Sequence, residues 1–264
     1  ARAIVNKTDK PIWVCSSGGI DSETVCRAFY DQGISFSVLT IEHDAGTNYH
    51  DIKFAIEWCR DRGVHHKIVR IDMPRFLTEE TDAYAQRYPA FHPFRYFQIK
   101  LMQIVEEMGG YAVLAGGEQL YQIDHEKKVF TKDDPYLLFT TGNLAPLDWC
   151  QDNNVQHEPY FYFSTPEVCA SYMRIPLVEL ALNNPEAVFL QKDNTYTLKR
   201  LVYQSVFTDL KVRYKADGFE KIAALVSDSS ARLKERFGTV FQSIHLPIAE
   251  FRRQLYAGLS NASK

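Results

Sequence analysis

The chain has 264 residues, a formal net charge of −3 and 45% hydrophobic residues. This length is enough for one large hydrophobic core, or for a core domain with a smaller appendage. The hydrophobic content excludes an intrinsically disordered chain, and the nearly balanced charge does not indicate bulk nucleic-acid binding.

The five cysteines form no C-x-x-C pair, which disfavours zinc ribbons and iron–sulfur clusters and indicates reduced, intracellular thiols. No apolar run reaches transmembrane length, and no signal peptide precedes Ala1. We therefore expect a cytoplasmic protein with no membrane partner. For a viral protein, the same composition fits the host cytoplasm or the virion.

The first half of the chain alternates between strand and helix signals, and glycines typical of helix ends separate them. Strands separated by helices predict parallel pairing with right-handed crossovers, that is, a doubly wound α/β sheet. In such sheets, ligands bind at the carboxyl ends of the strands. The predicted strands are residues 12–15, 36–42, 66–71 and 111–115, and the predicted helices are residues 23–32, 48–62 and 94–108.

The character of the chain changes near residue 124. We expect an α/β domain over residues 1–125 and a mainly helical region over residues 126–264. The charged stretch 126–134 fits a hairpin or a flexible insert. Residues 164–167 read Ser-Thr-Pro-Glu, which predicts a helix start because a capping hydroxyl precedes proline and glutamate. Further helices are predicted from residue 185 and over residues 196–212 and 219–237.

The most informative sequence is SGGIDS at residues 17–22, between the first predicted strand and the first predicted helix. Exposed backbone N–H groups in such a turn and at a helix N-terminus favour phosphate. The two glycines let the main chain approach an oxygen atom closely. Ser17 and Ser22 add hydroxyl donors, and Asp21 can hold Mg²⁺ beside phosphates. A turn without a ligand is the alternative, but it does not explain why Asp21 lies inside the turn.

The chain has no G-x-x-x-x-G-K-[ST] and no G-x-G-x-x-G after a strand, which disfavours Walker-type and dinucleotide sites. Residues 17–22 match the SGGxDS signature, and the chain resembles the PP-loop ATP pyrophosphatases, with a sheet of the HUP/PP-loop type. Within them it is most similar to the asparagine synthetase-like synthase domain. The resemblance implies a nucleotide-binding first domain whose pyrophosphate and metal contacts come from Ser17, Gly18, Gly19, Asp21 and Ser22.

The resemblance also implies the reaction. The enzyme would use ATP and Mg²⁺ to attach AMP to a carbonyl or carboxylate, and ammonia or an amine would then displace AMP. The pyrophosphate that leaves carries dense negative charge, which N–H groups, Mg²⁺ and cationic side chains must stabilise. This chain lacks the N-terminal glutaminase domain of asparagine synthetase, so nitrogen would come from free ammonia, a small amine or a partner subunit. Self-association is left open.

Further site residues follow from the same resemblance. Gly116-Gly117-Glu118 resembles a second glycine-rich stretch near the α-phosphate and the reacting centre, where Glu118 would bind Mg²⁺ or orient the nucleophile. The alternative is a glycine pair in a loop with a solvated glutamate. Ile41 lies where the family usually holds adenine, and the alternative there is a buried strand residue.

Cations for the phosphates are expected from the helical region, where Lys199 and Arg213 are the favoured catalytic candidates. For each of them alone, a solvated surface charge is the commoner explanation. Two other functions stay open. A PAPS reductase-like or sulfur-transfer enzyme would need a catalytic cysteine near the loop, and a non-catalytic nucleotide-binding or structural module in a larger assembly, for example a viral one, would need no Asp21.

Overall fold

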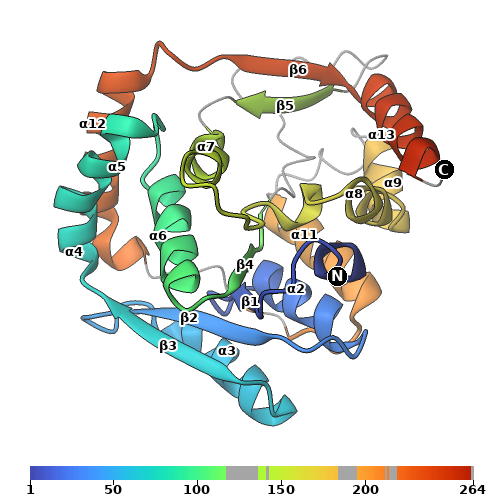
Figure 1. Cartoon of the computed structure of the whole chain (residues 1–264), viewed down its shortest axis with the longest axis horizontal. Coiled ribbons are helices and arrows are strands. Elements are labelled where there is room, and N and C mark those ends of the chain that lie inside the picture. Colours follow the sequence, from blue (N-terminus) through green and yellow to red (C-terminus); the bar gives the residue numbers. More distant parts are fainter. Residues whose placement is uncertain (117–135, 141–142, 184–194, 212, 214–218, 263–264) are drawn as a thin grey trace. The chain divides into compact units, whose positions relative to one another are not determined.

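The computed structural model (Figure 1) describes residues 1–116, 136–140, 143–183, 195–211, 213 and 219–262. The chain divides into two compact units. Each unit combines segments that are far apart in the sequence, so the division differs from the single boundary between residues 125 and 126 that composition suggests. The first unit contains Ala1–Ala115, Thr141–Pro159 and Tyr214–Gln242, and the second contains Gly116–Thr140, Tyr160–Arg213 and Ser243–Lys264.

A four-stranded parallel sheet with the order β3-β2-β1-β4 forms the centre of the first unit (Figure 1). This confirms the doubly wound parallel sheet predicted from the sequence. The strand order reverses beside β1, and such a switch point is where open α/β sheets bind ligands. The strands are β1 (Ile12–Cys15), β2 (Ser37–His43), β3 (His66–Ile71) and β4 (Tyr111–Leu114).

Helices that follow the strands bury their apolar stripes against the sheet. In α6, the side chains of Tyr96, Ile99, Met102 and Val105 recur every three residues, and all four are fully buried. The segment between β3 and α6, where no element was predicted, forms two short helices joined by a π-helical turn at Phe76–Glu80. The helices of this unit are α1 (Arg2–Val5), α2 (Ile20–Tyr30), α3 (Tyr49–Arg62), α4 (Met73–Arg75), α5 (Thr81–Arg87), α6 (Phe94–Glu107), α7 (Ala145–Asp152) and α12 (Ala223–Phe237), with a 3₁₀ turn at Phe219–Ile222.

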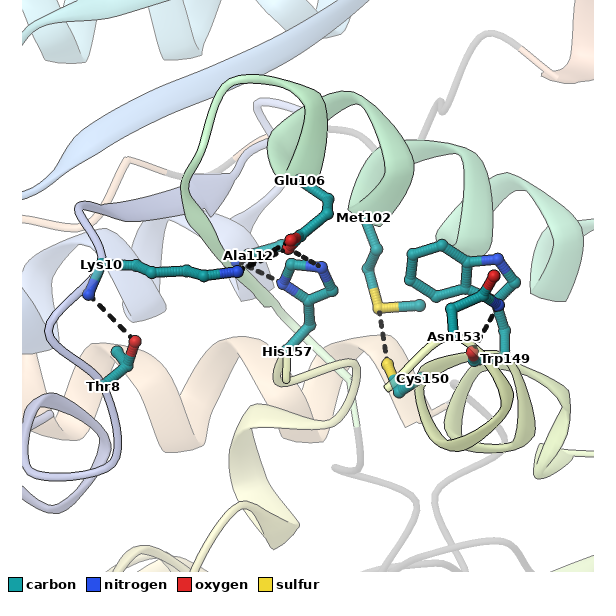
Figure 2. A network of polar contacts seen from close by, with 9 residues as sticks. All are labelled: Thr8, Lys10, Met102, Glu106, Ala112, Trp149, Cys150, Asn153 and His157. Atoms are coloured by element: carbon teal, nitrogen blue, oxygen red, sulfur yellow. Dashed lines mark hydrogen bonds and ion pairs between the residues drawn. The ribbon is translucent and has the colours of Figure 1, made fainter. Parts of the chain in front are cut away.

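Figure 2 shows a polar network at the amino ends of β1 and β4. Lys10 Nζ lies 2.8 and 2.9 Å from the two carboxylate oxygens of Glu106, and Glu106 Oε2 lies 3.3 Å from His157 Nε2. The N–H of Ala112 donates to His157 Nδ1 at 3.0 Å, and the imidazole stacks on the indole of Trp149. Because Nδ1 accepts this hydrogen bond, the neutral ring of His157 carries its proton on Nε2. The network joins the N-terminal segment to α6, β4 and the segment after α7.

The described part of the second unit contains a two-stranded antiparallel sheet and several helices. The sequence predicted a mainly helical region, with helices that begin at residues 164–167 and cover residues 196–212, but it predicted neither the helices at Pro176–Asn183 and Ile248–Ala262 nor the sheet. The predicted helix start at residues 164–167 is confirmed, since Thr165 Oγ1 accepts the N–H of Val168 at the first turn of α8. The elements are β5 (Tyr136–Thr140), β6 (Ser243–Pro247), α8 (Pro166–Met173), α9 (Pro176–Asn183), α11 (Thr195–Val206), α13 (Ile248–Ala262) and a 3₁₀ turn at Phe161–Phe163.

In the second half, one predicted helix is shorter than expected, and two other predicted features cannot be compared with the structure. The helix predicted over residues 196–212 ends at Val206, where the chain turns and Phe207 donates its N–H to the carbonyl of Tyr203. The charged stretch 126–134 and the helix predicted from residue 185 lie outside the described residues. No helix in the described ranges is both long enough and apolar enough to cross a membrane.

Candidate active site

The loop between β1 and α2 is closed by its own hydroxyl groups. The N–H of Gly18 donates to Ser16 Oγ at 3.3 Å, and Ser16 Oγ donates to Ser22 Oγ at 3.1 Å. Ser22 Oγ in turn donates to the carbonyl of Gly19 at 3.0 Å. Since a hydroxyl carries one proton, Ser22 uses its proton inside the loop, whereas the sequence suggested a donor to a ligand. Ser22 is 4% exposed, but Ser17 lies on the loop surface, where a ligand can reach its side chain.

The two glycines of the loop differ in what the fold requires of them. Gly18 has φ +87°, and a Cβ atom there would lie 2.0 Å from the carbonyl oxygen of Asp51, in the first turn of α3. Gly19 has φ −70° and ψ 164°, and a Cβ atom there would meet Ser17 Oγ at 3.3 Å. The packing of α3 against the loop therefore requires glycine at position 18. At position 19 only the exposed side chain of Ser17 would have to shift to accept a methyl group, so the packing does not require glycine there.

The N-terminus of α2 provides the electropositive end of the loop. The first intrahelical bond runs from the N–H of Glu23 to the carbonyl of Gly19 at 3.0 Å, so the N–H groups before it have no partner within the helix. The N–H of Gly19, the N-cap residue, donates to Ser17 Oγ at 3.3 Å. N–H groups at such a terminus, together with the helix dipole, favour an anion.

The first turn of α2 also contains two carboxylates, Asp21 and Glu23. Glu23 is buried and ion-paired with Arg27 at 2.7 Å, so its carboxylate is used within the helix. The described residues contain no group of three or more histidines, cysteines, aspartates or glutamates that could hold a metal. Mg²⁺ commonly takes one or two carboxylates and keeps several waters, and a role for Asp21 as such a ligand remains a prediction.

The end of β2, where the sequence suggested an adenine site, is held by Asn48. Its Nδ2 donates to the carbonyl of Ile41 at 2.8 Å, and its Oδ1 accepts the N–H of His43 at 2.9 Å. The side chain of Ile41 is 6% exposed and belongs to the hydrophobic core. Burial, and then the nearby His50, lower the pKa of His43 to about 4. A role for Ile41 in adenine binding remains a prediction, and the sequence did not identify Asn48.

The remaining predicted site residues lie in the second unit or outside the described residues. The carbonyl of Gly116 accepts the N–H of Tyr162 at 3.1 Å. Lys199 lies on α11, and Arg213 is 8% exposed, with its pKa lowered to about 10 by burial. Gly117 and Glu118 fall outside the described residues. That these residues complete the site remains a prediction.

All five cysteines of the chain are buried as free thiols. Burial raises the pKa of each, to about 12 for Cys59 and Cys150 and to about 11 for Cys169. The thiolate is the nucleophilic form, so these cysteines are inert at neutral pH. This arrangement disfavours sulfur transfer through the chain's own cysteines.

No protein-family model matches the chain. Among curated proteins, it is similar to a 7-cyano-7-deazaguanine synthase of Psychromonas ingrahamii, with 30% identity over 124 residues. The aligned region is 44% of this chain and 56% of that protein, so the chain spans about half the length of the curated relative it matches.

Two solved structures are also similar at low identity. The NMN synthetase from Francisella tularensis is 15% identical, with a TM-score of 0.39, over 89% of this chain and 88% of that chain. The NH3-dependent NAD synthetase from Campylobacter jejuni is 13% identical, with a TM-score of 0.35, over 81% of this chain and 94% of that chain.

Proposed function

We propose that the chain is an ATP-dependent adenylating enzyme of the PP-loop ATP pyrophosphatase superfamily, and its similarity to a 7-cyano-7-deazaguanine synthase over 124 residues supports this. In the proposed reaction, an oxygen of an acceptor carbonyl or carboxylate attacks the α-phosphorus of ATP, and the bond to the β-phosphate breaks. Pyrophosphate leaves, ammonia or an amine attacks the activated carbon, and AMP leaves. One observation supports this most directly: a helix N-terminus follows a buried strand, beside a glycine at position 19 that the fold does not require.

The loop residues would bind the pyrophosphate end of ATP. The N–H groups at the start of α2 and the hydroxyl of Ser17 would donate to phosphate oxygens, and Asp21 would hold Mg²⁺ beside them. Mg²⁺ would neutralise the charge that builds up on the leaving pyrophosphate. Glu118 is proposed as a second metal ligand, with Gly116 and Gly117 near the α-phosphate. Lys199 and Arg213 are proposed as the cations, and the asparagine synthetase-like branch remains part of the proposal.

The products test the reaction. The protein is incubated with MgATP, ammonia and a panel of small carboxylates, and nucleotide products are separated by chromatography. We expect AMP and pyrophosphate, together with an adenylylated acceptor detected by mass spectrometry when ammonia is omitted. ADP and orthophosphate would contradict the assignment. Absence of MgATP binding at millimolar concentration by calorimetry would instead indicate a non-catalytic module.

The Asp21→Asn variant tests the proposed metal ligand. Loss of one charge beside the pyrophosphate should lower the rate of AMP formation by about a hundredfold, the size seen when a single stabilising group is removed. Asp31→Asn is the matched control, because Asp31 is exposed at the other end of α2 and should leave the rate unchanged. An Asp21→Asn variant with wild-type activity would remove Asp21 from the site.

A further inference from the structure

We propose that Thr40 of β2 is a positioning residue for the loop at residues 17–22, and that His66 of β3 holds Thr40 in this role. This inference rests on the proposed function, because the ligand of the loop is taken to be the phosphates of ATP. A series of hydrogen bonds that runs from β3 through β2 to Ser16 would then orient the loop.

In this series of hydrogen bonds, His66 donates to Thr40 and Thr40 donates to Ser16. Thr40 Oγ1 donates to the carbonyl of Ser16 at 2.9 Å, which uses the one proton of its hydroxyl. His66 Nε2 lies 2.9 Å from the same Oγ1, so the imidazole must be the donor in that contact. This assigns the proton of the neutral His66 ring to Nε2. Burial, and then the adjacent His65, lower the pKa of His66, which favours the neutral ring.

Hydrogen bonds at both its N–H and its carbonyl hold the backbone of Ser16 in place. Its N–H donates to the carbonyl of Leu39 at 2.8 Å, and its own carbonyl accepts from Thr40. With the backbone fixed in this way, Ser16 Oγ meets the N–H of Gly18 and Ser22 Oγ, the contacts that close the loop. Any shift of Ser16 would therefore move the N–H groups of the loop. Misplacement of catalytic geometry by about 1 Å can reduce rates by about two orders of magnitude.

The position of Thr40 favours this role over simple packing. Val14 and Val38, its neighbours on the same face of the sheet, are fully buried, and Thr40 is also 0% exposed. Valine has nearly the same shape as threonine, so packing alone would be satisfied by valine at position 40. The hydroxyl contributes the two hydrogen bonds, and these join β3 to the loop.

The first experiment measures MgATP affinity of the full chain by calorimetry. Thr40→Val should weaken MgATP binding about tenfold, because Ser16 loses its hydrogen bond from Thr40 and the loss of one buried hydrogen bond is of that size. Thr40→Ser keeps the hydroxyl and should stay within about twofold of wild type. Val38→Ala is the control, since it shortens a buried side chain on the same strand and removes no hydrogen bond. Equal affinity in Thr40→Val and wild type would overturn the proposal, as would an equal loss in Val38→Ala.

A second measurement needs no nucleotide. In ¹⁵N NMR spectra of the wild type, His66 should show the tautomer protonated on Nε2, and Thr40→Val should shift the amide resonances of Gly18 and Gly19. Thr40→Ser should leave these resonances near their wild-type positions. Unchanged glycine amides in Thr40→Val would overturn the positioning role. If the wild type binds no MgATP, the proposed function fails, and the NMR result alone then decides whether Thr40 positions the loop.

Discussion

Protonation of His157 is expected to destabilise the first unit below neutral pH. Its imidazole is completely buried between Glu106 of α6, Trp149 of α7 and the backbone of β4 (Figure 2). Nδ1 accepts the N–H of Ala112, so a second proton on the ring would break this bond. Burial lowers the pKa of His157 to about 4; Glu106 acts in the opposite direction and Lys10 in the same direction.

The size of the effect follows from the two pKa values. The unfolded chain has a histidine pKa near 6.5, so the unfolded state binds more protons than the folded state between about pH 6.5 and pH 4. The stabilisation is therefore complete above the unfolded pKa and is lost as the pH falls through this range. At about 1.4 kcal/mol per pKa unit, the free energy of unfolding should decrease by about 2.5 kcal/mol between pH 7.5 and pH 4.5.

The assay is urea denaturation at a series of pH values, for the wild type and for His157→Gln. Glutamine offers an amide oxygen to the N–H of Ala112 but does not titrate in this range. The variant should lose about 2.5 kcal/mol of the pH dependence, whatever its stability at pH 7.5. His65→Gln is the control, because His65 is exposed. Equal pH dependence in wild type and His157→Gln would refute the reasoning.

Three further predictions concern the loop and the thiols. Gly18→Ala should reduce the free energy of unfolding by about 3 kcal/mol, since the positive φ and the contact with the Asp51 carbonyl both oppose a Cβ atom. Gly19→Ala should stay within about 0.5 kcal/mol of wild type in urea denaturation but bind MgATP more weakly; equal affinity would remove the ligand from that position. Iodoacetamide at pH 7.5 should leave all five cysteines unmodified in the folded protein and label them in urea; one rapidly labelled thiol in the folded protein would revive the sulfur-transfer function.

The parallel sheet was predictable because its signals are local. Each strand is a short apolar run, and each following helix has its own periodicity and its own ending, such as Gly63 with φ 63° after α3. The pairing of β5 with β6 was not predictable in this way. It joins residues 136–140 to residues 243–247, and neither segment contains a turn that would bring the other beside it. The π-helical turn at Phe76–Glu80 likewise has no sequence signal of its own.

In the candidate site, too, the sequence predicts the features that depend on neighbouring residues and misses those that depend on contacts between distant ones. Residues 17–22 predict a phosphate-binding loop because glycine, hydroxyl and carboxylate side chains follow one another between a strand and a helix. The sequence could not tell that the hydroxyl of Ser22 is used within the loop, since this depends on Ser16. It also could not identify Thr40, which lies 24 residues after Ser16 and reads as an ordinary strand residue. A polar residue buried in an apolar strand next to a binding loop is the signal that was available, because its hydroxyl must have a partner. If Thr40→Val weakens MgATP binding while Thr40→Ser does not, that partner is the loop itself.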